Sequence, residues 1–128
     1  MDFQQGLITT IHEYGIKKDL INELNKGLKN RPTAILIPCL YEEFERPALK
    51  SIREVLKNLN GLNELVIALS AKSKEQVISA KSFFESMPFP VHLQWTNSPS
   101  VIELLKSQER NGLELLGTPG KGWAVWQG

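Results

Sequence analysis

The sequence predicts an α/β fold, in which a mostly parallel sheet of at least three strands is flanked by helices. Two observations support this. Short apolar runs alternate along the chain with longer segments whose apolar residues recur at helical spacing. The first run, Thr33–Ile37, lies between prolines and has no polar alternation, which is typical of a strand covered on both faces of a parallel sheet. Parallel strands of this kind are joined by right-handed crossovers that carry helices.

The first part of the chain, residues 1–31, is predicted to be a helical segment. Gly15 separates a weaker first helix from a stronger second one, and Pro32 ends the helical region because proline disfavours helix at the residue before it. The apolar stripe of the stronger helix consists of Ile16, Leu20, Ile21, Leu24 and Leu28.

The first strand is predicted to stop at Pro38, and a short loop with Glu42 and Glu43 follows it. Pro47 suits the first position of the next helix, and Asn60-Gly61 is a good helix stop. The apolar stripe of this helix is Leu49, Ile52, Val55, Leu56 and Leu59.

The same pattern recurs twice. Glu64–Leu69 is a second buried strand, and Ser73 with Gln76 predicts a capping box for a helix that carries Val77, Ala80, Phe83 and Phe84. Val91–Thr96 alternates apolar and polar residues, which indicates a third strand nearer the edge of the sheet. A helix then begins with Ser98 as N-cap and Pro99 as first residue, and it ends at Asn111-Gly112.

The last sixteen residues, "LELLGTPGKGWAVWQG", predict a glycine-rich loop followed by the first turns of a helix. We interpret Trp123 and Trp126 as packing residues rather than ligand contacts. Because the sequence ends two residues after Trp126, Val125 and Trp126 have little to pack against, and we expect a chain cut short.

Composition narrows the classes of function. The formal charge of +1 and the absence of a basic run argue against nucleic-acid binding. No apolar stretch approaches the roughly 20 residues that cross a bilayer, and the N-terminus lacks the pattern of a signal peptide. A single cysteine, Cys39, cannot form an internal disulfide. We expect a cytoplasmic protein that binds neither nucleic acid nor membrane.

Familiar catalytic and metal-binding motifs are missing from the sequence. His12 and His92 are the only histidines, Asp2 and Asp19 the only aspartates, and none of them has a neighbour at metal-ligand spacing. The chain contains neither a Walker lysine motif nor GxGxxG. Cys39 has no candidate base nearby in the sequence, so we interpret it as a packing residue rather than a nucleophile.

Candidate ligand contacts lie in the loops that follow the strands, because ligands of open parallel sheets bind outside the carboxyl ends of the strands. For Glu42 and Glu43 the residues alone leave two interpretations open. They are acids favoured by the dipole of the next helix, or one of them accepts hydrogen bonds from a ribose or base. Gly117–Gly122, with Lys121, is either a flexible connection or a loop that meets a diphosphate.

Taken together, "ILIPCLYEE", "ELVIALS", a third strand and "GTPGKGWAVWQG" resemble the N-terminal half of GT-A-type glycosyltransferases. The closest likeness is to the group that includes glucosyl-3-phosphoglycerate synthase and mannosylglycerate synthase. The resemblance covers roughly residues 33–128. It implies a three-layer, Rossmann-like (GT-A-like) half domain over residues 32–128, the nucleotide-binding half, which stops before the Asp-x-Asp motif.

Site residues follow from the resemblance position by position. It implies that Ser70 lies near the base and that Lys121 approaches the diphosphate or donor sugar. Tyr41 stands where the family commonly has asparagine, which affects base contact or donor choice. The remaining residues, implied to line the uridine site, are Pro38, Cys39, Leu40 and Glu43.

The implied function is the sugar-nucleotide-binding part of a glycosyltransferase. In full length it would transfer a glucosyl-like unit from a UDP- or GDP-sugar to a small acceptor such as phosphoglycerate or glycerate. We expect no catalytic or metal-binding residue in this chain, a divalent metal (Mg²⁺ or Mn²⁺) only in the full-length enzyme, no activity of the chain alone, and a homo-oligomer. The alternative is a non-catalytic α/β binding or interaction module that dimerises through its C-terminal tryptophan region.

Overall fold

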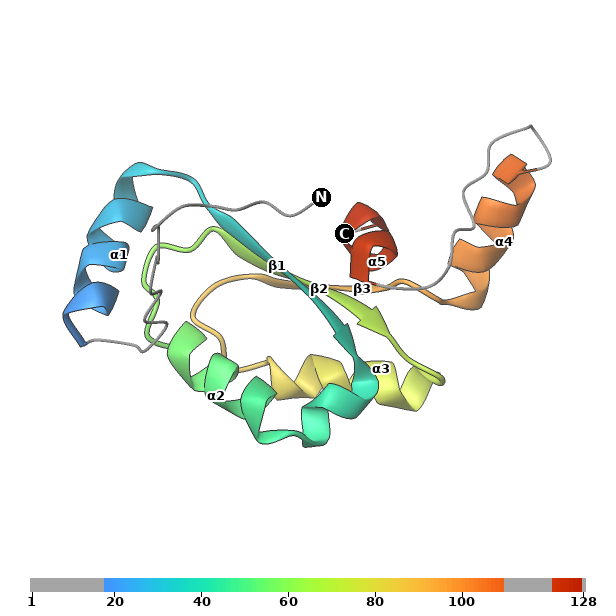
Figure 1. Ribbon diagram of the computed structural model, residues 1–128, viewed down its shortest axis with the longest axis horizontal. Coiled ribbons are helices and arrows are strands. Elements are labelled where there is room, and N and C mark those ends of the chain that lie inside the picture. Colours follow the sequence, from blue (N-terminus) through green and yellow to red (C-terminus); the bar gives the residue numbers. More distant parts are fainter. Residues whose placement is uncertain (1–17, 110–120, 128) are drawn as a thin grey trace, which may run out of the picture.

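The computed structural model describes residues 18–109 and 121–127 of the 128-residue chain. Its helices and strands alternate along the sequence (Figure 1). In chain order they are α1 (Lys18–Asn30), β1 (Ala34–Leu40), the 3-10 helix η1 (Tyr41–Glu45), α2 (Pro47–Leu56), β2 (Glu64–Ser70), α3 (Lys74–Phe83), β3 (Val91–Trp95), α4 (Pro99–Glu109) and α5 (Lys121–Gln127).

The three strands form one parallel sheet in the order β1-β2-β3. Helices α2 and α3 cover one face of this sheet, and α5 packs against β1 and β2 on the other face (Figure 1). The predicted α/β fold with a parallel sheet between helices is therefore confirmed.

The core lies between the sheet and helices α2 and α3. In β2, Leu65, Ile67, Ala68 and Leu69 are fully buried, as predicted for a strand covered on both faces. In β1 the residues from Ile35 to Cys39 are only half-buried by the part of the chain that the structure describes. The prediction of a strand covered on both faces therefore fits β1 less well than β2.

The first strand is longer than predicted, because β1 continues through Pro38 to Leu40. Along β2 the peptide groups alternate between the two neighbouring strands, and the N–H of Leu65 donates to the carbonyl of Pro90 before β3. Alternate residues of β2 therefore bond to β1, and this alternation directs the amide position of Pro38 to the outer edge of β1. A proline costs the ladder no hydrogen bond at such a position.

Helix boundaries agree with the sequence pattern at their starts better than at their ends. Pro47 is the first residue of α2, as predicted, but α2 ends at Leu56 rather than at Asn60-Gly61. The intervening residues form a turn in which Gly61 adopts a φ of +100°, a conformation that favours glycine. Asn25 of α1 ties this turn down: its side-chain amide donates to the carbonyl of Asn58, and its oxygen accepts from the N–H of Asn60.

Predictions for residues 1–17 and for the helix end at Asn111-Gly112 fall outside the described residues. The predicted C-terminal helix is confirmed as α5. On α5, Val125 and Trp126 are 48% and 60% exposed, which agrees with the expectation that they have little to pack against.

Candidate functional site

A pocket opens at the carboxyl ends of β1 and β2, where an open parallel sheet binds its ligands. Its volume is about 350 Å³. Residues from both loops and from α3 line it: Leu40, Glu42, Glu43, Arg46, Ser70, Ala71, Lys72 and Gln76. It contains both glutamates that the sequence singled out.

The loop after β1 is anchored to α3 by its aromatic residues. The ring of Tyr41 stacks on Phe44 at a centroid distance of 5.5 Å, and the Tyr41 hydroxyl donates a hydrogen bond of 3.3 Å to Ser79 on α3. Phe44 is buried and meets the rings of Phe83 and Phe84 edge to face. Tyr41 thus belongs to the packing of η1 on α3 and does not line the pocket.

Two ion pairs cross the mouth of the pocket. Arg46 Nη1 lies 2.9 Å from Glu43 Oε1 within the first loop, and Lys72 Nζ lies 2.8 Å from Glu42 Oε1, joining the loops of β1 and β2. The hydrogen bond from Lys72 is the main cause that lowers the pKa of Glu42, and the same bond raises the pKa of Lys72. Each of the two carboxylates has a basic partner, so the pocket carries balanced charges.

The loop after β2 is held by hydrogen bonds from the last residue of β3 and from the two residues that follow it. Thr96 is buried, and both its hydroxyl and its N–H donate to the carbonyl of Leu69. Trp95 Nε1 donates to the carbonyl of Ala71, while the N–H of Ala71 donates to Asn97 Oδ1, each over 3.0 Å. The backbone on which Ser70 and Lys72 stand is therefore fixed by direct hydrogen bonds.

The structure brings together some of the residues that the resemblance implied. Leu40, Glu43 and Ser70 line the pocket. Pro38 lies in β1 two residues before Leu40 but does not line it. Lys121 opens α5, and its side chain lies outside the described part of the structure.

Cys39 packs against the core of buried residues below the sheet rather than lining the pocket. Burial, and to a smaller extent the charge of Glu43, raise the pKa of its thiol to about 11. A thiol of this kind is neutral at physiological pH, which supports the interpretation of Cys39 as a packing residue.

Arg46, Lys72 and Gln76 line the pocket but were not predicted as site residues. Lys72 lies in a loop that the sequence marked, but the carboxylate it pairs with comes from another loop, and no sequence spacing indicates such a partner. Gln76 was predicted as a capping residue. Its N–H does donate to Ser73 Oγ, but its side-chain oxygen accepts from the N–H of Lys72 instead of Ser73, so the capping box is only half formed.

Within residues 18–109 and 121–127, no group of three or more His, Cys, Asp or Glu side chains is placed to hold a metal ion. None of the helices described is both long and apolar enough to cross a membrane.

Comparison with known proteins gives two close matches. The chain is 36% identical over 127 residues to the glucosyl-3-phosphoglycerate synthase of Methanococcoides burtonii, a match that covers 98% of this chain and 31% of that protein. The resemblance to glucosyl-3-phosphoglycerate synthases is confirmed. The synthase of Persephonella marina is 32% identical over 126 residues, which are 97% of this chain and again 31% of the relative.

This chain thus spans less than a third of the length of the synthases it matches. A match over nearly the whole chain takes in the sheet and the loops that build the pocket. No family model matches the sequence, and no solved structure matches it.

Proposed function

We propose that this chain is the sugar-nucleotide-binding part of a glycosyltransferase. In the complete enzyme, a glucosyl-like unit would pass from a nucleoside-diphosphate sugar to a small acceptor such as phosphoglycerate or glycerate. The observation that carries the proposal is the similarity to glucosyl-3-phosphoglycerate synthases over 98% of the chain. The pocket at the carboxyl ends of β1 and β2 supports it, because sugar nucleotides are ligands that open parallel sheets bind at this edge.

The pocket chemistry suits a nucleoside. A volume of about 350 Å³ is at the small end of the range for ligand sites, as expected for a site that receives only part of a ligand. The carboxylate of Glu43 is the group we assign to the ribose hydroxyls or a base N–H, since an ionised acceptor makes strong hydrogen bonds. Ser70 adds a hydroxyl from β2, and Leu40 lines the pocket beside it.

We also propose that this chain supplies no metal ligand. In support, Glu42 and Glu43 each pair with a basic side chain rather than converging on a shared point. A divalent cation, Mg²⁺ or Mn²⁺, would neutralise the departing diphosphate in a longer enzyme. We therefore assign a binding role to the 128-residue chain and expect no sugar transfer by this chain alone.

Calorimetric titration of the chain with UDP and, separately, with GDP tests this proposal and identifies the base. We expect saturable binding of one of them. Glu43→Gln should raise its Kd about ten- to a hundredfold, because a hydrogen bond to a charged group contributes about 1.5–3 kcal/mol. Glu45→Gln is the matched control, since Glu45 is an exposed neighbour in η1 that does not line the pocket.

If neither UDP nor GDP bound at a concentration of about 10 mM, the proposal would be overturned. That result would favour the alternative of a non-catalytic interaction module, which the exposed Trp126 permits but the similarity to synthases does not favour. We also propose a cytoplasmic location, supported by the single cysteine, which suits a reducing compartment.

A further inference from the structure

Within residues 18–109 and 121–127, no neighbouring strand pairs with the backbone groups at the outer edge of β3. Leu65 donates to the carbonyl of Pro90, and Thr96 donates to the carbonyl of Leu69, so the even-numbered residues of β3 direct their peptide groups to β2. Alternation then directs the N–H and C=O groups of Val91, Leu93 and Trp95 away from β2. The carbonyl of Trp95 accepts from the N–H of Ser98, which leaves one of its two lone pairs for a further donor.

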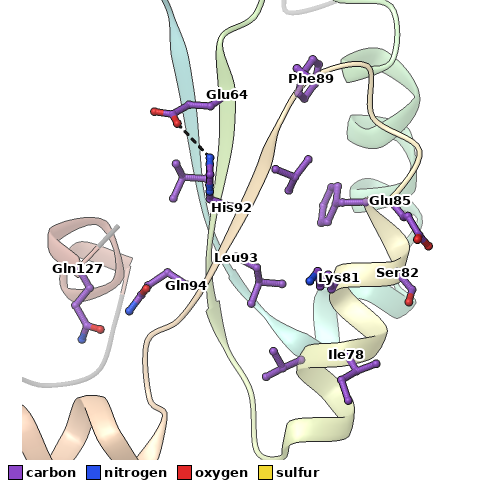
Figure 2. A pocket seen from close by; sticks show the side chains of 14 residues that line it. Glu64, Ile78, Lys81, Ser82, Glu85, Phe89, His92, Leu93, Gln94 and Gln127 are labelled. Carbon is purple, nitrogen blue, oxygen red and sulfur yellow. Dashed lines mark ion pairs between the residues drawn. The ribbon is translucent and has the colours of Figure 1, made fainter.

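A groove of about 990 Å³ runs along the same edge (Figure 2). On one side, α3 contributes apolar surface, including Ile78, which is 58% exposed. On the other side are polar side chains: His92 and Gln94 of β3 and Gln127 of α5. A strand added here must therefore be apolar toward α3 and polar toward α5.

β3 itself has this alternation. Val91, Leu93 and Trp95 pack toward the core below the sheet, whereas His92 and Gln94 occupy the intervening positions on the opposite face. A two-fold axis perpendicular to the sheet would bring a second β3 alongside, antiparallel, with each kind of side chain kept on its own face. A second copy thus matches both sides of the groove.

We propose that the chain forms a dimer by antiparallel pairing of β3 with β3 of a second copy, with Leu93 opposite Leu93. The residues with outward peptide groups would then become hydrogen-bonded pairs, Leu93 with Leu93 and Val91 with Trp95, and the two sheets would become one. Lys81 and Glu85 both line the groove, so each copy would bring one charge of each sign to the contact.

The sequence of β3 lacks the devices that usually protect an edge. The strand VHLQW contains no lysine, no acidic residue and no proline, although such residues commonly block edge pairing. This inference deepens the expectation of a homo-oligomer by naming its surface. It does not depend on nucleotide binding, so either proposal can fail while the other stands.

The first experiment tests the register. Leu93 opposite Leu93 places His92 opposite Gln94 of the other copy in a non-hydrogen-bonded pair, where Cα atoms lie about 4.5 Å apart, within disulfide range. In a Cys39→Ser background, an oxidised mixture of the His92→Cys and Gln94→Cys chains should yield a cross-linked dimer. In a dimer of one variant alone, the two introduced cysteines would be diagonal neighbours across the strands rather than directly opposite. Because this distance is longer, each variant alone should cross-link at least about fivefold less.

The second experiment tests the surface by analytical ultracentrifugation. Ile78→Glu should raise the dimer dissociation constant at least about tenfold, because the carboxylate would be buried by the second copy. Ile52→Glu is the matched control: Ile52 is an isoleucine on α2 that is 43% exposed and does not line the groove, so its variant should associate normally. Thermal melts followed by circular dichroism establish that both variants fold.

Three results would overturn the proposal. The unmodified chain could remain monomeric at about 1 mM. The mixed cysteine variants could cross-link no better than either one alone. Alternatively, Trp126→Ala could abolish the dimer while Ile78→Glu leaves it intact, which would move the interface to the exposed face of α5.

Discussion

At the scale of single residues, the position of a side chain on the sheet decides its chemistry. Cys39 directly precedes Leu40, which lines the pocket, yet its thiol packs toward the core on the other face. Its pKa of about 11 follows mainly from burial and secondly from the charge of Glu43.

We expect the thiol of Cys39 to react slowly in the folded protein. Raising the pKa from 9.0 to about 11 lowers the fraction of thiolate at pH 8 about a hundredfold. The thiolate of a more basic thiol is the better nucleophile, and this offsets about tenfold of the loss in rate. Reaction with a chromogenic disulfide at pH 8 should therefore be at least about tenfold slower than in urea. Glu43→Gln should increase the rate only slightly, because burial is the larger cause. Equal rates in the folded and unfolded chain would contradict this explanation.

The same pKa predicts how stability changes in alkali. The folded-state pKa of Cys39 lies above its unfolded value, so its contribution to stability is complete below about pH 9 and is lost as the pH rises through about 11. Urea midpoints of the unmodified chain should fall more steeply across this interval than those of Cys39→Ala. Parallel curves for the two proteins would show that the thiol does not ionise at a shifted pKa.

Single residues also show what the sequence can predict about the site. The strand pattern marked the loops after the first two strands, because the carboxyl ends of parallel strands share one edge of a sheet. The family resemblance then singled out Leu40, Glu43 and Ser70, which line the pocket. The partners Arg46 and Lys72 could not be predicted, because the choice of ion pair depends on how two loops approach each other in space.

At the scale of elements, local hydrogen-bonding patterns were predicted most reliably. Ser98 is an example: its hydroxyl accepts from the N–H of Val101 at the start of α4, as expected of an N-cap followed by proline. The predicted end of β1 at Pro38 was wrong, because it depends on pairing between strands and not on local hydrogen bonds. A proline ends a strand only when its missing N–H is needed, and which edge Pro38 faces depends on the neighbouring strand rather than on local sequence.

Removal of the cap should destabilise the protein. We expect Ser98→Ala to lower the free energy of unfolding by about 1 kcal/mol, because the N–H of Val101 loses its acceptor, and Ser98→Asp to restore part of the loss. Ser100→Ala is the control, since Ser100 is exposed and only its contact with the Ser98 hydroxyl is removed. Urea denaturation monitored by circular dichroism measures both, and equal losses in the two alanine variants would reject the cap as the cause.

At the scale of the whole molecule, an aromatic cluster joins the pocket loop to the core. Phe84 is 1% exposed and meets both Phe44 and Phe83 edge to face. Apolar periodicity predicted that Phe83 and Phe84 belong to the core. It did not predict that Phe44 and Tyr41 join them, because the sequence around η1 has no helical repeat long enough to detect.

Phe84→Ala should be severely destabilising. Loss of a buried phenylalanine costs about 3–5 kcal/mol, a large part of the stability of a domain of this size. Phe84→Leu, which keeps more of the volume, should cost less, and Ile52→Ala at an exposed position of α2 should cost little. Denaturation midpoints give the order, and a Phe84→Ala protein as stable as Ile52→Ala would show that the cluster is not part of the stabilising core.

Helix α3 contributes residues to both the pocket and the groove, so it can couple the two surfaces energetically. Gln76 lines the pocket, the next two residues, Val77 and Ile78, line the groove beside β3, and Ser79 holds the hydroxyl of Tyr41. A shift of this helix on self-association would therefore also displace the loop that carries Glu43. Thermodynamic reciprocity then requires that a nucleotide shift the dimerisation constant by the same factor by which dimerisation shifts the affinity for the nucleotide.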